Sequence, residues 1–372
     1  MTLQYAYEFA IVGAGPAGLS AAIEAAKHGV KKIAIVDENP KPGGQLLKQI
    51  HKFFGSQEHR AGVRGIDIAF QMAKEAKNCS VDMFLNTAVW GIFEENLLGL
   101  VNNGEIRTLH ADKILLATGA SENTLAFPGW TLPGVIGAGA AQTMVNIHRV
   151  SIGEKILMVG SGNVGLIVSY QLMQAGAKVV AVVEILPKIG GYLVHASKIA
   201  RLGVPILTCH TVKEVNGNGK VERATVVKVD SHQQPIQGTE RNFDIDTVCI
   251  GVGLTPLAEL AWICGCEFKY VSELGGWVPI YDENMETSVP GIYVAGDMAG
   301  IEEAATALMD GAIVGLGVAQ SLGYLSKERY EELKMEKAKS LDFFRQGKFE
   351  LRRIAKQKLS EKEGRVKQCL KE

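Results

Sequence analysis

The stretch that decides the fold is Tyr7-Glu8-Phe9-Ala10-Ile11-Val12-Gly13-Ala14-Gly15-Pro16-Ala17-Gly18. A mostly apolar run of strand formers leads into a glycine-rich turn, and an Ala-rich helical stretch follows it. A second apolar run ends at Val36 and is followed by Asp37 and Glu38. This order of strand, turn, helix and acidic strand end predicts a β-α-β unit that binds a dinucleotide. An acidic side chain there would bind both ribose hydroxyls, and we favour Glu38 over Asp37.

The residues of the turn each have a physical task in such a site. Gly13 permits the tight turn, Gly15 lets the backbone approach a diphosphate, and Gly18 lets the helix pack closely against the strand. The helix that begins at Pro16 and Ala17 directs unpaired N–H groups toward the phosphates. We therefore expect all five residues to contact the cofactor or to shape its site.

The same pattern recurs 147 residues further along the chain. A strand over Lys155 to Val159 leads into the turn Gly160-Ser161-Gly162-Asn163-Val164-Gly165, and a later strand ends in Glu184. This long period excludes a solenoid and predicts a second dinucleotide-binding domain. The expected contacts there are Gly160, Gly162, Asn163 and Val164.

The nucleotide preference of the second site depends on the end of its second strand. Glu184 would accept the ribose hydroxyls, as NAD requires, and no Arg cluster that could hold a 2′-phosphate follows it; only Lys188 is near. Gly251 and Gly253, after a strand over Thr247 to Ile250, would close over this nucleotide. NAD is therefore favoured over NADP, while binding without hydride transfer stays an alternative.

Three further motifs combine glycines or small residues with strand ends. Gly43-Gly44-Gln45 offers a second close backbone approach and an amide side chain. Ala117-Thr118-Gly119 and Gly296-Asp297 each follow a short apolar strand, and the Asp297 carboxylate is suited to a polyol hydroxyl. The helical stretch from Glu302 to Val318 would direct its N-terminus at the cofactor.

Together these motifs resemble those of flavoproteins with two dinucleotide-binding domains, a group that includes thioredoxin reductase and glutathione reductase. The resemblance spans about Tyr7 to Gly323. It implies an α/β fold of two Rossmann-like domains with a helical C-terminal extension. FAD would bind at the first site, and NAD(H) would bind at the second. Further cofactor contacts that it implies are Ala88, Val89, Ala304 and Ala305.

A narrower resemblance is carried by Asp37 through Leu46, by Ala117 through Ala120, and by the stretch Phe127-Pro128-Gly129-Trp130-Thr131-Leu132-Pro133-Gly134-Val135. These resemble the A or alpha subunits of opine oxidase, hydrogen cyanide synthase, sarcosine oxidase and dye-linked L-proline dehydrogenase. The resemblance implies an electron-relay subunit in a hetero-oligomer. Its partners would be a second flavin-containing subunit that oxidises an amine or amino acid, and a small iron–sulfur protein. The alternatives are a stand-alone NAD(P)H-dependent flavin oxidoreductase and a flavoprotein scaffold with a vestigial second site.

The sequence departs from these relatives in two places. They commonly carry an Arg shortly after Ala-Thr-Gly-Ala, where this chain has Ser121 to Thr124. Several also have a C-terminal cysteine cluster, whereas Cys369 alone cannot hold an iron–sulfur centre. No Cys-x-x-Cys pair exists, and we expect Cys264 and Cys266 to be inert thiols. We therefore predict no catalytic side chain and no metal site, since the chemistry would belong to the flavin.

Composition sets the limits of this interpretation. The 372 residues are 47% hydrophobic and 21% charged with a net charge of -1, which excludes disorder and a global field for nucleic acid. We expect an FAD domain over 1–120 and 254–325, an NAD(P) domain over 121–253, and a basic helical extension over 326–372. The extension carries 15 Lys and Arg against 9 Asp and Glu. We expect it to lie outside the core domains, where it could hold an acidic partner. With no signal peptide or membrane span predicted, the expected location is cytoplasmic.

Overall fold

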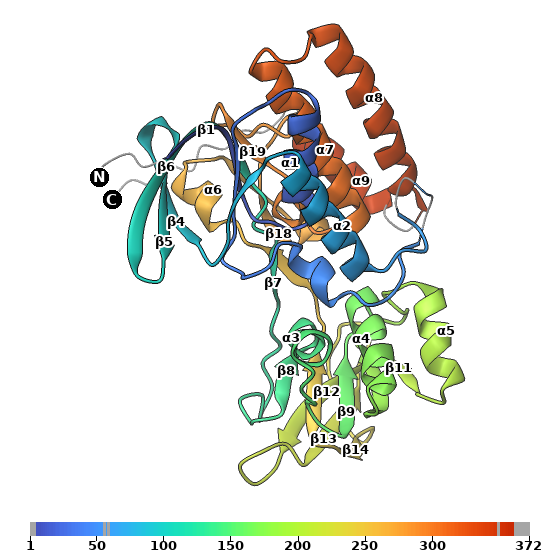
Figure 1. Cartoon of the computed structure of the whole chain (residues 1–372). Coiled ribbons are helices and arrows are strands. Elements are labelled where there is room, and N and C mark those ends of the chain that lie inside the picture. Colours follow the sequence, from blue (N-terminus) through green and yellow to red (C-terminus); the bar gives the residue numbers. More distant parts are fainter. Residues whose placement is uncertain (1–4, 55–56, 58–59, 348–349, 361–372) are drawn as a thin grey trace, which may run out of the picture. The chain divides into compact units, whose positions relative to one another are not determined.

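The computed structural model describes residues 5–54, 57, 60–347 and 350–360. The chain forms two compact units (Figure 1). Unit 1 comprises Met1–Ser121 and Thr255–Glu372, and unit 2 comprises Glu122–Leu254. The chain passes from one unit to the other through β7 (Ala120–Glu122) and returns through β16 (Leu254–Pro256). Unit 1 is therefore discontinuous in sequence, with unit 2 inserted into it.

Unit 1 is built on a parallel sheet whose strands are apolar enough to be buried on both faces. Its strands lie side by side in the order β3 (Asp82–Phe84), β2 (Ile33–Val36), β1 (Tyr5–Val12), β6 (Glu105–Leu116) and β19 (Ile292–Val294). The first half of β6 also pairs antiparallel with β5 (Leu97–Asn102), which pairs with β4 (Ala88–Phe93). A five-stranded parallel sheet thus shares its long strand with an antiparallel meander.

Before the C-terminal extension, unit 1 also contains four helices. They are α1 (Pro16–Lys27), α2 (Gly65–Asn78), α6 (Glu259–Ile263) and α7 (Ala304–Ser321), with short helical turns η1 (Gly44–Lys48), η2 (Glu94–Asn96), η4 (Ser272–Leu274) and η5 (Gly296–Ala299) among the described residues. A hairpin of β17 (Phe268–Val271) and β18 (Gly276–Pro279) completes the unit. Helices α1 and α7 can approach closely because Gly311 has no side chain: a Cβ there would lie 2.1 Å from the Ala17 carbonyl oxygen.

Helix α7 is long and apolar enough to cross a membrane by length and composition alone. It is 78% buried inside the unit, which is also what the core helix of a globular domain shows. Asp310 lies within it and is 1% exposed.

Unit 2 repeats the plan of unit 1. Its parallel strands follow the order β11 (Ile206–Thr208), β10 (Lys178–Glu184), β9 (Lys155–Val159), β15 (Thr247–Ile250) and β8 (Val135–Gly137). Its helices are α3 (Ala138–Thr143), η3 (Met144–His148), α4 (Asn163–Gln174) and α5 (Leu193–Arg201). A meander of β12 (His210–Asn216), β13 (Arg223–Lys228) and β14 (Arg241–Asp244) is attached. The predicted α/β fold with two similar parallel sheets is confirmed.

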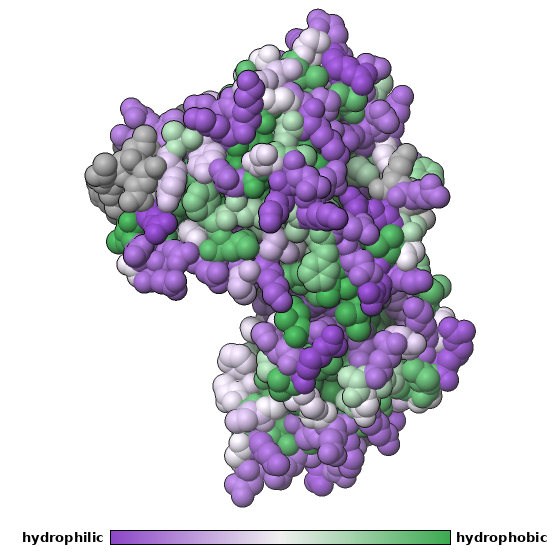
Figure 2. Space-filling view, viewed as in Figure 1, coloured by the Kyte–Doolittle hydropathy of each residue, from purple (hydrophilic) through white to green (hydrophobic). Residues whose placement is uncertain are grey.

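The C-terminal extension forms α8 (Lys327–Phe344) and α9 (Glu350–Ser360). Helix α8 runs alongside α7 (Figure 1), and Ser326 caps it by accepting a hydrogen bond from the Arg329 N–H at 3.3 Å. Hydrophilic residues cover the outer side of this region in Figure 2, whereas Leu341 and Leu359 are buried in the core of unit 1. The expectation that the extension lies outside the core domains was therefore wrong, because its apolar side chains complete that core.

Candidate functional site

The carboxyl ends of the unit 1 strands bring the sequence motifs together. The N–H of Gly13 donates to the carbonyl of Val36 at 2.8 Å, and the N–H of Ala117 donates to that of Val12 at 2.8 Å. Ala295, after β19, donates in turn to Leu116 at 3.2 Å. Ligands of open parallel sheets bind at this edge. The glycine turn, Ala117-Thr118-Gly119 and Gly296-Asp297 therefore lie together at the edge where a ligand is expected.

The three glycines of the turn are required for different reasons. Gly13 has φ +109°, and a Cβ there would lie 2.3 Å from the Ala117 carbonyl oxygen. A Cβ on Gly18 would lie 1.9 Å from the Gly13 oxygen. Gly15, however, has ordinary angles of φ -76° and ψ -173°, and a Cβ there would meet nothing within 4 Å. The fold explains the first and third glycines, while the space above Gly15 fits the close approach of a ligand.

The two acids after β2 have different surroundings. Asp37 is buried, and its carboxylate accepts hydrogen bonds from the Ala14 N–H at 2.6 Å and from the Asn39 N–H at 2.8 Å. It therefore braces the turn. Glu38 is exposed beside it. This arrangement supports Glu38 as the ribose-binding carboxylate, because the oxygens of Asp37 already have protein donors.

The loop after β2 lies against the glycine turn. The N–H of Gly43 donates to the Ala14 carbonyl at 2.7 Å, and a Cβ on Gly44 would lie 2.8 Å from the Gly15 Cα. Gln45 is exposed next to them. The loop thus borders the open space above Gly15, where a diphosphate would lie.

The remaining predicted contacts of unit 1 occupy three places. Ala88 and Val89 are half-buried at the start of β4. The Thr118 hydroxyl donates to the Leu257 carbonyl at 2.6 Å, so it holds two segments of the unit together. Ala304 and Ala305 begin α7, and their N–H groups belong to its N-terminal turn.

Asp297, at the same edge of the sheet, has a carboxyl group with a raised pKa. Burial raises its pKa to about 6, although the nearby Lys356 ammonium favours the charged form. Its Oδ1 accepts from the Glu302 N–H at 3.3 Å. Gly296 has φ +69°, and a Cβ there would lie 3.1 Å from the Ala17 Cβ, so the strand end comes close to α1. A half-buried carboxyl group that is costly to ionise fits a site that offers it hydroxyl donors.

Unit 2 has an equivalent edge. Gly160 donates to the Val183 carbonyl at 2.7 Å, and a Cβ on Gly160 would lie 2.1 Å from the Gly251 oxygen. Gly162 has φ -64° and ψ 173°, with nothing within 4 Å of a Cβ. Asn163 and Val164 form the first turn of α4, and Gly253 lies in the exposed loop after β15. A second nucleotide backbone would have the same open approach as at Gly15.

Glu184 occupies the position of Asp37 rather than that of Glu38. It is buried, and Oε2 accepts from the Ser161 N–H at 3.0 Å and the Ser161 hydroxyl at 2.6 Å. Oε1 accepts from the Leu186 N–H at 2.9 Å. The residue equivalent to Glu38 is Ile185. The carboxylate that was predicted to bind ribose is therefore engaged by protein groups, because it braces the turn of unit 2.

Sequence reasoning missed a further part of the repeat. Pro40-Lys41-Pro42-Gly43-Gly44 recurs as Pro187-Lys188-Ile189-Gly190-Gly191, also 147 residues later. The second copy is tied to its turn by hydrogen bonds from Gly190 N to Ser161 Oγ at 3.0 Å and from Gly191 N to the Ser161 carbonyl at 2.6 Å. The constant offset was the signal that could have revealed it.

Glu122, in the stretch that follows Ala120, stabilises a helix start. Its carboxylate accepts from the N–H groups of Gly139 at 2.6 Å and Ala140 at 3.1 Å, at the start of α3. This cap satisfies N–H groups that the helix itself leaves unpaired. No feature of the sequence around Glu122 indicated it.

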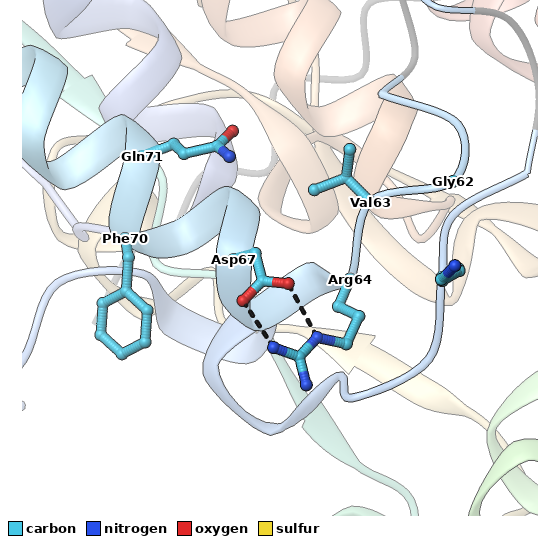
Figure 3. A pocket seen from close by; sticks show the side chains of 7 residues that line it. Gly62, Val63, Arg64, Asp67, Phe70 and Gln71 are labelled. Carbon is cyan, nitrogen blue, oxygen red and sulfur yellow. Dashed lines mark hydrogen bonds and ion pairs between the residues drawn. The ribbon is translucent and has the colours of Figure 1, made fainter.

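Other candidate centres lie apart from these edges. A hollow of about 490 Å³ beside the start of α2 contains the Arg64–Asp67 ion pair at 2.7 Å, with Phe70 and Gln71 further along the helix (Figure 3). None of the predicted cofactor residues lines it. Within the described residues, no group of three or more His, Cys, Asp and Glu side chains could hold a metal ion. Cys369 lies outside those residues.

Burial makes the free cysteines Cys264 and Cys266 poor nucleophiles. It raises the pKa of Cys264 to about 12 and also raises that of Cys266. Thiol–disulfide exchange requires a thiolate, so neither cysteine is suited to it near neutral pH.

Comparisons with known proteins agree with this geometry. The model of the family described as pyridine nucleotide-disulphide oxidoreductase matches residues 7–311. An opine oxidase subunit of Agrobacterium tumefaciens is 28% identical over 87% of this chain and 67% of its own. The HcnB subunit of hydrogen cyanide synthase from Pseudomonas aeruginosa is 30% identical over 83% of this chain and 70% of its own. The alpha subunit of sarcosine oxidase from a Corynebacterium is 25% identical over 84% of this chain but only 32% of its own.

Solved structures share the fold. Thioredoxin reductase of T. acidophilum superposes with a TM-score of 0.70 at 24% identity, over 86% of this chain and 99% of its own. L-Proline dehydrogenase of P. horikoshii has a TM-score of 0.68 at 23% identity, over 90% of this chain and 59% of its own. The fold is thus that of thioredoxin reductase. The chain belongs to the pyridine nucleotide-disulphide oxidoreductase family, and it is an FAD-dependent oxidoreductase related to subunits of multisubunit amine and amino-acid oxidases.

Proposed function

We propose that this chain is the electron-relay subunit of a cytoplasmic amine or amino-acid dehydrogenase complex, and that it passes electrons between NAD(H), or another acceptor, and a partner subunit. The partner would be a second flavin-containing subunit that oxidises a CH–NH or CH–NH2 donor, and a small iron–sulfur protein would complete the complex. The relatives support this, because opine oxidase, hydrogen cyanide synthase and sarcosine oxidase are each represented by one of their subunits.

One observation carries the relay assignment. The carboxyl edge of unit 1 offers backbone N–H groups, open glycines and carboxylates, which bind a nucleotide but do not oxidise a substrate. The described cysteines that are nearest in sequence, Cys264 and Cys266, have raised pKa values that disfavour a disulfide route. When bound, FAD supplies hydride and one-electron transfer. Electrons would then enter and leave this chain at its cofactor alone.

The chain's own residues would bind and orient that cofactor. The Gly13–Gly18 turn and the N-terminus of α1 would hold the diphosphate. Glu38 would accept hydrogen bonds from the adenosine ribose, and Asp297 would accept them from the ribityl hydroxyls. The N-terminal turn of α7 would offer further N–H donors and a positive partial charge.

A specific observation favours a second candidate, a flavoprotein whose second nucleotide site takes no part in hydride transfer. Glu184 is occupied by Ser161 and Leu186, so the acid that was expected to recognise NAD is engaged elsewhere. The third candidate, a stand-alone NAD(P)H-dependent flavin oxidoreductase, would need unit 2 to deliver hydride unaided.

The experiment purifies the protein from its source and separately produces the chain alone. Flavin absorbance is followed anaerobically after NADH, after NADPH, and after candidate amines in the presence of co-purified subunits. The relay function predicts flavin reduction by an amine only when the partner is present. The Gly162→Ala variant should lose any response to NADH and keep its FAD. Rapid reduction of the isolated chain by NADH with no co-purifying partner would favour the stand-alone enzyme. The scaffold alternative would be favoured by a flavin that is reduced neither by an amine in the presence of the partner nor by a pyridine nucleotide.

A further inference from the structure

Four charged side chains form a buried cluster between the C-terminal extension and α7. Arg345, at the end of α8, binds Glu302 through Nε–Oε1 at 2.8 Å and Nη2–Oε2 at 2.5 Å. Its Nη2 also reaches Asp310 Oδ1 at 3.1 Å. Lys356 Nζ, from α9, lies 2.7 Å from Glu302 Oε2 and 3.2 Å from Asp310 Oδ2. The extension therefore contributes both cations, and the α7 region contributes both anions.

The cluster is well shielded from water. The side-chain exposures are 12% for Arg345, 6% for Lys356, 4% for Glu302 and 2% for Asp310. Buried charges cost much desolvation free energy unless they are paired and hydrogen-bonded. Each cation here touches both anions, so the cluster fixes where its four side chains lie relative to one another.

Glu302 links this cluster to the cofactor edge. Its backbone N–H donates to the Asp297 carboxylate at 3.3 Å, and its side chain holds both cations of the extension. The segment from Asp297 to Glu302 ends two residues before α7 begins at Ala304. Its geometry therefore sets both the Asp297 carboxyl group and the N-terminus of α7.

The extension is anchored elsewhere as well, so it does not depend on the cluster alone. The Tyr330 hydroxyl and the Lys334 ammonium both donate to Asn284 Oδ1, at 2.6 and 2.5 Å. Leu341 and Leu359 are buried in the unit 1 core. A change of one cation in the cluster can thus alter the Asp297–Glu302 segment while the helices remain docked.

We propose that Arg345 and Lys356 are positioning residues for FAD: through Glu302 they hold Asp297 and the start of α7 in the geometry that retains the cofactor. The inference rests on FAD binding at unit 1 and holds whatever partner or acceptor the chain serves. The family match ends at residue 311, so it does not extend to these two residues. The extension would then stabilise the cofactor-binding edge of unit 1, whereas the sequence suggested that it could bind an acidic partner.

The charges around Asp297 support this role. Burial raises the pKa of Asp297, Lys356 opposes that rise, and the carboxylates of Glu303 and Glu302 add to it. Arg345 and Asp310 complete the surroundings through their contacts in the cluster. Loss of the Lys356 charge should therefore make Asp297 harder to ionise.

The test compares Lys356→Met with Lys356→Arg and Arg353→Met in the full-length chain. Arg353 lies on α9 too, but its ion pairs are with Glu350 and Asp342 inside the extension. FAD affinity is measured by flavin fluorescence from about pH 5 to 8, with the unfolding midpoint of each apoprotein as a second readout. We expect Lys356→Met to bind FAD at least about tenfold more weakly at neutral pH, since a charge-assisted anchor of the segment is lost. The pH at which this variant retains half of its FAD should be higher than in the wild type, because Asp297 becomes harder to ionise.

The matched variants decide between a positioning role and a merely structural one. Lys356→Arg should restore most of the affinity, and Arg353→Met should bind FAD as the wild type does. A Lys356→Met protein with a lower unfolding midpoint but unchanged FAD affinity and pH profile would overturn the proposal. Should Lys356→Met fail to fold, Glu302→Gln with Lys356→Met removes one charge of each sign. Weakened FAD binding by that double variant supports the proposal, and wild-type affinity refutes it.

Discussion

The replacement of Gly15 by alanine separates the needs of the cofactor from those of the fold. Gly15 has φ -76° and ψ -173°, which alanine adopts without strain, and a Cβ there meets nothing within 4 Å. A Gly→Ala change at such a position stabilises a protein by about 0.4–1 kcal/mol, because the unfolded chain loses freedom. We therefore expect the Gly15→Ala apoprotein to unfold at the same or a slightly higher urea concentration than the wild type.

The cofactor-bound state should respond in the opposite direction. FAD at about 100 times its dissociation constant stabilises the wild type by about 2.7 kcal/mol. The new methyl group would occupy the space through which the diphosphate approaches the turn, so most of this gain should vanish. Urea unfolding with and without added FAD, together with the FAD content of the purified protein, measures both effects.

A neighbouring glycine supplies the control. A Cβ on Gly18 would lie 1.9 Å from the Gly13 oxygen, so Gly18→Ala should impair folding with or without FAD. The reasoning would be refuted by a Gly15→Ala protein that binds FAD with wild-type affinity. An apoprotein destabilised by more than about 1 kcal/mol would also contradict it, since that would mean that the fold needs this glycine.

Two further predictions concern the carboxyl groups of Glu184 and Asp297. Glu184→Gln should lower the stability of unit 2 toward urea by about 1–3 kcal/mol, because Ser161 loses a charged acceptor; the exposed Glu222→Gln serves as its control, and equal stability of the two would contradict the bracing role. Since burial raises the pKa of Asp297 to about 6, the folded apoprotein holds a proton there that the unfolded chain releases at lower pH. The stability of the wild type relative to Asp297→Asn should therefore fall as the pH rises from about 4 to about 6. Urea titrations at several pH values measure this difference. A difference that stays constant over this range would show that folding does not raise the pKa of Asp297.

The sequence was most informative where function depends on local chain geometry. A strand, a turn of Gly13, Gly15 and Gly18, and a helix are adjacent in sequence, so their meeting follows from the β-α-β unit itself. The motifs at Ala117 and Gly296 lie far from that turn in sequence. They were still assignable to one site, because parallel strands present their carboxyl ends at a common edge.

The sequence was less informative where a side chain is engaged by distant groups. A carboxylate after a strand has the same appearance whether it meets a ribose or the backbone, and Glu184 meets Ser161, 23 residues away. The extension was expected to lie outside the core domains, because the partners of two of its buried cations are distant in sequence. Arg345 and Lys356 find theirs 35 to 54 residues away, at Glu302 and Asp310. Such pairs depend on tertiary packing, which residue spacing does not encode.

The two units share a plan but differ at the position that would recognise a ribose, and this difference can be tested. Glu38 and Ile185 are equivalent by the 147-residue offset, and each follows an acid that braces its turn. A carboxylate at position 185 would accept hydrogen bonds from the ribose hydroxyls of NADH and repel the 2′-phosphate of NADPH.

If unit 2 binds pyridine nucleotides, Ile185→Glu should tighten NADH binding by about threefold to tenfold, the effect of one added hydrogen-bonded contact, without a matching gain for NADPH. Fluorescence titration measures both affinities. Leu186→Glu adds the same charge at the adjacent exposed position, and it should leave the affinities for NADH and NADPH unchanged. An equal gain for both nucleotides, or none for NADH, would mean that Ile185 does not border the ribose and that the equivalence of the two sites stops at their glycine turns.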